Sequence, residues 1–322
     1  MHVADHFLTP ETSLATGILA AGALAAVVTV GRPRFSAQRV GLAGAAAAVV
    51  FGAQMFTFPV LEGASGHLMG GVLAAALIGP RLALLAIAAV LALQSAVFGD
   101  GGITALGTNI LVMGVVPIAI AVGVKRLADA IGAARFPRST AAVAALASVP
   151  AGALVLVALY ALGGAGSVDL GSMALTMTRL HLLIGVGEAL ITLAVLSLVM
   201  VAAPGATAWD ARPAGASAPL RAGIALGSSA VVFATALAAV AATTPDGLES
   251  VVLAYGLPIG EAIATGMPLL SEYGAIAGTG IALVGAIGIV AAGLVTIGLS
   301  SPLLAVAGMP RAARPERRAA HR

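Results

Sequence analysis

The 322-residue sequence contains no cysteine, and only 9% of its residues are charged. The absence of cysteine excludes disulfide bonds and thiolate metal ligands. The scarcity of charge excludes a soluble domain, because 60% of the residues are hydrophobic and the mean hydropathy is +1.08. This composition is typical of a polytopic membrane protein, for which we expect an all-α fold.

Motifs for catalysis and for nucleotide binding are also absent. The sequence has no His-Glu-x-x-His zinc motif, no Gly-x-Ser-x-Gly elbow and no pair of aspartates within its apolar segments. These absences argue against an intramembrane enzyme. The phosphate-binding Gly-x-x-x-x-Gly-Lys motif is missing as well, so any ATP that drives this protein must be hydrolysed on separate subunits.

Nine apolar segments are candidates to cross a hydrocarbon core of ~30 Å. One of them, 65–79, is short, and we expect it to cross while buried in protein, where lipid thickness does not set its length. No basic region precedes the first segment, which indicates an uncleaved helix rather than a signal peptide. The segments run about 12–30, 40–58, 65–79, 82–98, 103–124, 140–162, 174–201, 220–242 and 276–298.

The positions of the basic residues predict the orientation in the membrane. Arg32, Arg34 and Arg39 follow the first segment, so the positive-inside rule places that end in the cytoplasm. With about nine transmembrane helices, Arg179 is the one residue among 16 Lys and Arg that falls elsewhere. We therefore expect a multi-pass protein of the cell membrane with its N-terminus outside and its C-terminus in the cytoplasm.

The chain begins Met1-His2, an arrangement that can chelate a transition metal ion. The α-amine, the His2 backbone nitrogen and His2 Nδ1 can close adjacent five- and six-membered rings, which leaves one planar position for a second imidazole. Such a nitrogen square suits Ni(II) and Cu(II), and Co(II) less well. His67, predicted on the same outer face in a Gly-rich loop, is the candidate fourth ligand. The alternative is that these histidines are simply solvated. We favour that alternative for His6, and His321 lies on the wrong face to contribute.

An ionisable group inside a span costs at least ~2.5 kcal/mol and persists only when it is paired or faces a cavity. Glu188 is the clear example, and His181 precedes it by about two helical turns on the same face. These two side chains could support the metal-binding loop without binding the ion, as could Asp5 and Ser65. They could equally form a polar contact between helices that has no part in metal binding. The uncharged polar residues of the spans fit interhelical hydrogen bonds better than metal ligands: Gln54, Gln94 and Asn109.

Five motifs lie within the first 200 residues: Phe51-Gly-Ala-Gln-Met-Phe-Thr-Phe-Pro59, Gly63-Ala-Ser-Gly-His-Leu-Met-Gly70, Leu77-Ile-Gly-Pro80, Phe98-Gly-Asp-Gly-Gly-Ile-Thr-Ala-Leu-Gly107 and His181-Leu-Leu-Ile-Gly-Val-Gly-Glu-Ala-Leu-Ile-Thr192. Together they resemble the CbiM/NikM family, the substrate-binding M components of nickel and cobalt energy-coupling factor transporters. The resemblance implies that the metal sits on Met1, His2 and His67. This chain departs from the family opening Met-His-Ile-Pro-Asp-Gly, because it reads Val3-Ala4-Asp5-His6 after His2.

The C-terminal third contains Thr244-Pro-Asp-Gly-Leu-Glu249 between two apolar segments. This motif resembles the small auxiliary N component of the same transporters, fused here to the M component. The resemblance implies a metal-binding component at 1–201, a cytoplasmic linker at 202–219 and an N-like component at 220–322. From the residues alone, the motif is a turn beside a solvated acidic face, or an acidic loop that gathers cations or steadies the N-terminal loop.

The resemblance implies a substrate-binding subunit that captures Ni(II) or Co(II), with nickel preferred, for uptake. Its implied partners are a transmembrane coupling protein and two ATPase subunits, besides membrane lipid, and we expect no nucleic acid. The alternative is a self-sufficient secondary metal-cation transporter or channel. That alternative would require ionisable residues along a path through the membrane, whereas Glu188 and its charged neighbours lie in one segment.

Overall fold

The structure is a computed structural model, and it describes residues 1–31, 33–61, 63–257 and 279–304. Helices form most of these residues, and in the described ranges seven of them are long and apolar enough to cross a membrane. The predicted all-α, polytopic membrane fold is therefore confirmed. Arg32, the basic tail after Leu304 and His321 lie outside the described residues. The seven helices are Pro10–Thr29, Pro80–Phe98, Leu106–Ala130, Pro137–Gly163, Leu170–Ala202, Ala218–Val240 and Ala282–Leu303.

Several of these helices contain π-helical or 3₁₀ turns. A π turn inserts one extra residue and redirects the side chains around it, and such turns are frequent at functional sites. The long helices and their extensions are α1 (Pro10–Thr29), α4 (Pro80–Leu93) with η1 (Gln94–Phe98), α5 (Leu106–Asn109) with η2 (Ile110–Val115) and α6 (Val116–Ala130), α7 (Pro137–Gly163), α8 (Leu170–Ala202), α9 (Ala218–Val232) with η3 (Phe233–Leu237) and η4 (Ala238–Val240), and α12 (Thr279–Ser300) with η6 (Ser301–Leu303).

The two remaining predicted segments differ from each other. Segment 40–58 forms the 19-residue helix α2 (Ala37–Met55). Segment 65–79 is helical only in its second part, α3 (Gly71–Ile78), whose eight residues extend about 12 Å. The first residues instead form β2 (Ala64–Gly66), which pairs antiparallel with β1 (Phe58–Leu61). All of α3 is buried, as predicted for a segment enclosed by protein.

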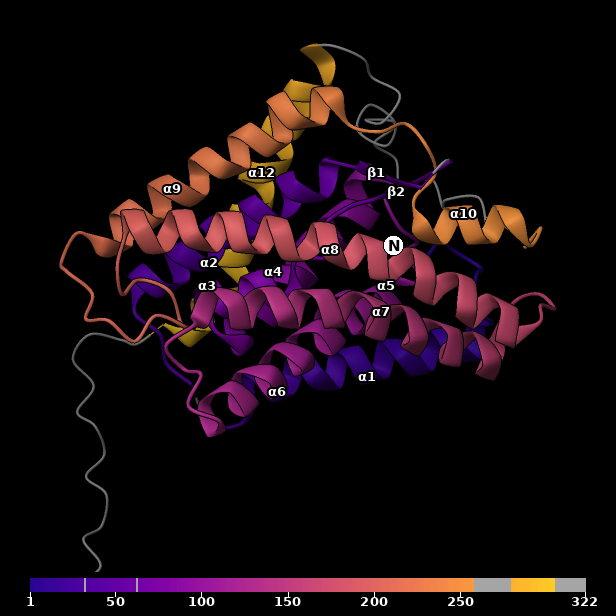
Figure 1. The fold of residues 1–322 in the computed structure, drawn as a ribbon, viewed down its shortest axis with the longest axis horizontal. Helices are drawn as coiled ribbons and strands as arrows, with labels where there is room; N and C mark the ends of the chain where they lie inside the picture. Colours follow the sequence, from indigo (N-terminus) through magenta and orange to yellow (C-terminus); the bar gives the residue numbers. More distant parts are fainter. Residues whose placement is uncertain (32, 62, 258–278, 305–322) are drawn as a thin grey trace, which may run out of the picture.

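The C-terminal helices pack directly on the N-terminal ones. Helix α12 lies against α2 and α4, and α9 lies against α2 and α8 (Figure 1). Small residues permit this close approach: a Cβ on Gly44 of α2 would lie 2.9 Å from the carbonyl oxygen of Gly293 in α12. In lipid such packing replaces the hydrophobic drive that holds soluble helices together. The two parts of the chain therefore form one helical body.

The helical body has two ends of different chemical character. One end holds the chain's first residues, the β1–β2 hairpin and the short helix α10 (Gly247–Ala254), as Figure 1 shows. At the other end, the Trp209 N–H donates to the carbonyl of Ala76 in α3, and Arg81 donates to the carbonyl of Val30. We call these the metal end and the basic end. The basic end is defined by Arg81, Lys125, Arg135, Arg138 and Arg212.

Candidate metal centre

The first residues of the chain run into the protein interior. The side chains of Met1, Val3 and Phe7 are all buried. Asn109 fixes the backbone of Val3 from both sides, because its Oδ1 accepts from the Val3 N–H at 2.8 Å and its Nδ2 donates to the Val3 carbonyl at 3.1 Å. Gly102 also donates to that carbonyl. The sequence analysis assigned Asn109 to interhelical bonding, whereas its described bonds position the N-terminal segment.

Asp5 anchors the same segment two residues after Val3. Its side chain is 1% exposed, and its Oδ1 accepts hydrogen bonds from the backbone N–H and the hydroxyl of Thr104. Gly102 makes this approach possible, since a Cβ there would lie 2.7 Å from the carbonyl carbon of Ala4. Asp5 therefore supports the candidate ligands by fixing the backbone that follows them. His6 is exposed to solvent and has a positive φ of 63°.

The α-amine of Met1 meets His67 in this buried position. The amine donates to Nε2 of His67, and it lies 2.9 Å from Oδ2 of Asp246. The other ring nitrogen of His67, Nδ1, is 3.0 Å from the carbonyl oxygen of Leu68, so it is the nitrogen that carries the proton. Nε2 is then the nitrogen with a free electron pair. Two of the four predicted ligand atoms thus lie together, and both are suited to binding a metal.

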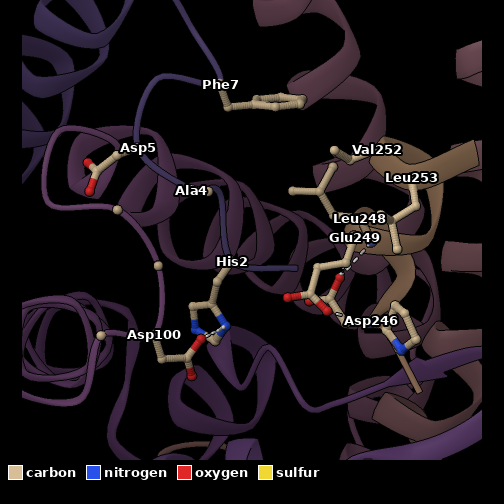
Figure 2. Close-up of a pocket in the computed structure, with 14 residues that line it drawn as sticks. His2, Ala4, Asp5, Phe7, Asp100, Asp246, Leu248, Glu249, Val252 and Leu253 are labelled. Carbon is tan, nitrogen blue, oxygen red and sulfur yellow. Dashed lines mark hydrogen bonds and ion pairs between the residues drawn. The ribbon is translucent and has the colours of Figure 1, made fainter. Parts of the chain in front are cut away.

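The imidazole of His2 stacks on that of His67, with ring centroids 4.9 Å apart and an angle of 15° between the planes. Its Nδ1 lies 3.1 Å from Oδ1 of Asp100 (Figure 2). Its Nε2 lies 3.3 Å from Oε1 of Gln94. Burial lowers the pKa of His2 to about 4, although Asp100 opposes the shift. The ring is therefore neutral near pH 7, but it must turn away from Asp100 before Nδ1 can close a chelate with the amine.

Two glutamine side chains, Gln94 and Gln54, connect His2 to the loop of Met69 through a series of hydrogen bonds. Gln94 donates to Oε1 of Gln54 at 2.9 Å, and Gln54 donates to the carbonyl of Met69 at 3.1 Å. The first of these bonds joins η1, the extension of α4, to α2, which confirms the predicted interhelical role. Gln94 begins the π turn η1, so the irregularity of this helix coincides with the contact to His2. No sequence pattern indicates that contact.

Glu188 holds the loop that carries His67. It is fully buried in α8, and its two oxygens accept from the N–H groups of Met69 and Gly70 at 2.5 and 2.9 Å. Of the two roles left open for Glu188, support of the metal loop is the one that these bonds favour. His181 makes a bond within its own helix, because its Nδ1 lies 2.8 Å from the carbonyl of Met177, and this bond does not decide between the two roles left open for it. Among the described residues its Nε2 has no hydrogen-bond partner.

Asp246 is the site residue that the sequence analysis missed. Its Oδ1 caps α10 by accepting from the N–H groups of Leu248 and Glu249, and its Oδ2 lies 3.4 Å from Nε2 of His67. Burial raises the pKa of the Asp246 carboxyl, but the Met1 ammonium and His67 outweigh burial and hold that pKa well below its usual range. The sequence indicated only that the acidic loop could gather cations or steady the N-terminal loop, and the contact of Asp246 with the Met1 amine favours the second role. No local pattern singled out Asp246 itself.

Ser65 bonds the segment that carries Asp246. Its N–H donates to the carbonyl of Pro245 at 2.8 Å, and its hydroxyl donates to the carbonyl of Thr244 at 2.7 Å. Ser65 thus joins the His67 hairpin to the C-terminal part of the chain rather than contacting a ligand side chain.

A cavity of about 430 Å³ opens beside these groups. Its polar lining comes from His2, Asp5, Asp100, Asp246 and Glu249, and Figure 2 shows the carboxylates of Asp100 and Asp246 on either side of His2. Within the described ranges, no group of three or more His, Asp or Glu side chains is placed to hold a metal ion. A metal centre here would therefore need main-chain nitrogen ligands, as the Met1-His2 chelate provides.

Residues 2–206 match the family model of CbiM, the cobalt uptake substrate-specific transmembrane region. A relative in Haloquadratum walsbyi, assigned to metal transport, is 34% identical over 63% of this chain and 92% of its own length. The fused nickel transport protein NikMN of Rhodobacter capsulatus is 37% identical over 46% of this chain and 42% of its own length. The crystal structure of a transition metal transporter superposes with a TM-score of 0.57 at 25% identity, covering 62% of this chain and 93% of the other.

These matches agree with one another and with the fold. The relatives are named as metal transport proteins and not as enzymes, and the matched model accounts for more than half of the chain. The residues after 206 lie beyond that model and form the helices that pack on α2, α4 and α8. The chain belongs to the CbiM/NikM family of metal uptake proteins, in the form that carries a fused N component.

Proposed function

We propose that this chain is the substrate-binding subunit of an energy-coupling factor transporter and that it captures Ni(II), or Co(II), at its buried N-terminus. The ligands are the Met1 amine, the backbone nitrogen and Nδ1 of His2, and Nε2 of His67. The observation that carries the proposal is the contact between the Met1 amine and Nε2 of His67 in a position from which water is largely excluded.

The nickel preference follows from the geometry of the ligands. An amine, a backbone nitrogen and two imidazoles can lie in one plane around the ion, which is the arrangement that Ni(II) accepts more readily than Co(II). The His2 ring must leave Asp100 to reach this plane. Each ligand must also lose or lack a proton, and the neutral state of His2 satisfies that condition near pH 7.

The same proposal assigns a different component to each of three parts of the chain. Residues 1–201 form the metal-binding component, 202–219 a cytoplasmic linker and 220–322 the N-like component. The packing of α9 and α12 on α2 supports a permanent association of the two components. A transmembrane coupling protein and two ATPase subunits supply the movement and the energy, since no nucleotide-binding motif is present in the sequence.

The test is a nickel and cobalt titration of purified protein that starts at Met1, compared with a variant carrying one extra residue before Met1. We expect stoichiometric binding and a square-planar nickel spectrum for the first protein. The extension converts the amine into an amide and moves the new amine out of the chelate, so binding should be lost. Equal binding by both proteins would refute the proposed site. Metal uptake into vesicles that contain this chain alone would refute the dependence on partner subunits.

A further inference from the structure

Asp246 comes from the fused component but points at ligand atoms of the metal-binding component. One of its oxygens, Oδ1, is committed to the N-terminus of α10, where Asp246 and Glu249 form a reciprocal capping box. The other oxygen, Oδ2, is 2.9 Å from the Met1 amine and 3.4 Å from Nε2 of His67. The side chain is 12% exposed. Its geometry is therefore fixed by α10, while its free oxygen faces the two atoms that our proposal assigns to the ion.

The segment that carries Asp246 is bonded to the hairpin that carries His67. Besides the Ser65 bonds to Thr244 and Pro245, Thr57 and Ala242 exchange two hydrogen bonds at the start of the hairpin, of 2.6 and 2.9 Å. Gly247 permits the close contact with α8, because a Cβ there would lie 2.6 Å from the side chain of Ile184. Asp246 and His67 are consequently held in register by two backbone–backbone hydrogen bonds and by the short hydroxyl side chains of Ser65 and Thr57.

A carboxylate at this position can balance the charge of a bound ion. A divalent ion bound by an amine, two neutral imidazoles and one deprotonated amide still carries a net positive charge in a mostly buried site. An uncompensated charge in such a site is strongly disfavoured, whereas a paired one can be accommodated. Oδ2 of Asp246 already lies beside the positive Met1 ammonium, so it is placed to face the ion that replaces the ammonium proton.

We propose that Asp246 is the carboxylate partner of the metal centre, so that the fused component completes the binding site. It holds the Met1 amine and His67 in position before the ion binds, and it balances the charge of the ion afterwards. This inference rests on the proposed function, since it assumes that the ion binds at Met1, His2 and His67.

The experiment is a nickel titration of the full chain with its native start, in Asp246→Asn and in a matched control, Glu249→Gln. Asparagine has the shape of aspartate and caps helices about as well, so Asp246→Asn removes the charge and preserves α10. Glu249→Gln removes one negative charge from the same helix and the same cavity. Asp246→Asn should weaken nickel binding about 10- to 100-fold, as expected for a group next to the ligands, while Glu249→Gln should stay within about twofold of the original protein.

The outcomes separate this inference from the proposed function. If the unmodified protein binds no nickel, the proposed function itself fails. If it binds nickel and Asp246→Asn binds equally well, the role of Asp246 is refuted and the proposed site stands. Equal weakening in both variants would also refute that role, because the effect would come from the overall charge of the loop. Should Asp246→Asn fail to fold, Asp246→Ser offers another uncharged cap with the same expected loss.

Discussion

The metal end and the basic end of the molecule each contain an ion pair, and the two pairs differ in their surroundings. At the basic end Lys125 and Asp129 approach to 2.5 Å on the surface of α6, where their side chains are 26% and 46% exposed. At the metal end Met1 and Asp246 lie 2.9 Å apart with 2% and 12% exposure. An exposed pair contributes about 0–1 kcal/mol, whereas breaking a buried pair costs roughly 3–5 kcal/mol. Burial, and not distance, therefore decides which charges matter here.

The largest expected effect comes from removing a nitrogen at the metal end. His67→Ala should weaken nickel binding by more than ~100-fold, because even groups that only support metal ligands change affinity about 10- to 100-fold. His6→Ala is the control, because it removes the sixth residue of the chain, a histidine that is exposed to solvent. Parallel metal titrations check the pair. Similar nickel affinities in the two variants would contradict the prediction that the buried His67, and not the exposed His6, binds the ion.

An intermediate effect is expected from Glu188→Gln, which replaces one acceptor oxygen by an NH₂ group facing the backbone N–H of Met69 or Gly70. The loss of a buried hydrogen bond should reduce the free energy of unfolding by about 1–3 kcal/mol and loosen the His67 loop. Thr192→Val on the same helix is the control, since among the described residues the buried Thr192 hydroxyl has no partner. Thermal unfolding in detergent measures both, and equal shifts would argue against the role of Glu188.

The smallest effect is expected at the basic end. Lys125→Ala removes the exposed ion pair with Asp129, and it should change the free energy of unfolding by less than ~1 kcal/mol and leave nickel affinity unchanged. Thermal unfolding and a nickel titration again provide the measurement. A destabilisation as large as that of Glu188→Gln would mean that the two ends do not differ in the way their burial indicates.

Much of the fold followed from local patterns in the sequence. Long apolar runs predicted the positions of α1, α2, α4, α7, α8 and α9, because hydropathy alone decides which segments enter a membrane. Segment 65–79 was harder, since a run of Gly, Ala and Leu is compatible with both a helix and an extended strand. The pairing of Phe58 with Gly66 decided the question in favour of a hairpin before α3.

Parts of the candidate site were predictable for a similar reason. The Met1-His2 chelate is a property of two adjacent residues, so the sequence could indicate it, and His67 followed from its loop and its predicted face of the membrane. The metal assignment stays a prediction. The orientation of His2 toward Asp100 was not predictable, because it depends on a loop nearly 100 residues further along the chain.

The sequence by itself determined the class of the protein, the approximate helices and the absence of thiolate chemistry, and it predicts nitrogen ligands at its start, because each depends on composition or on neighbouring residues. Tertiary structure decided that Glu188 binds the loop after His67, that Ser65 joins the hairpin to residues 244 and 245, and that Asp246 faces the Met1 amine. Those contacts join residues separated by more than 100 positions. Only the packing of α8, α9 and α12 on α2, α3, α4 and α7 brings them together, and no local pattern encodes that packing.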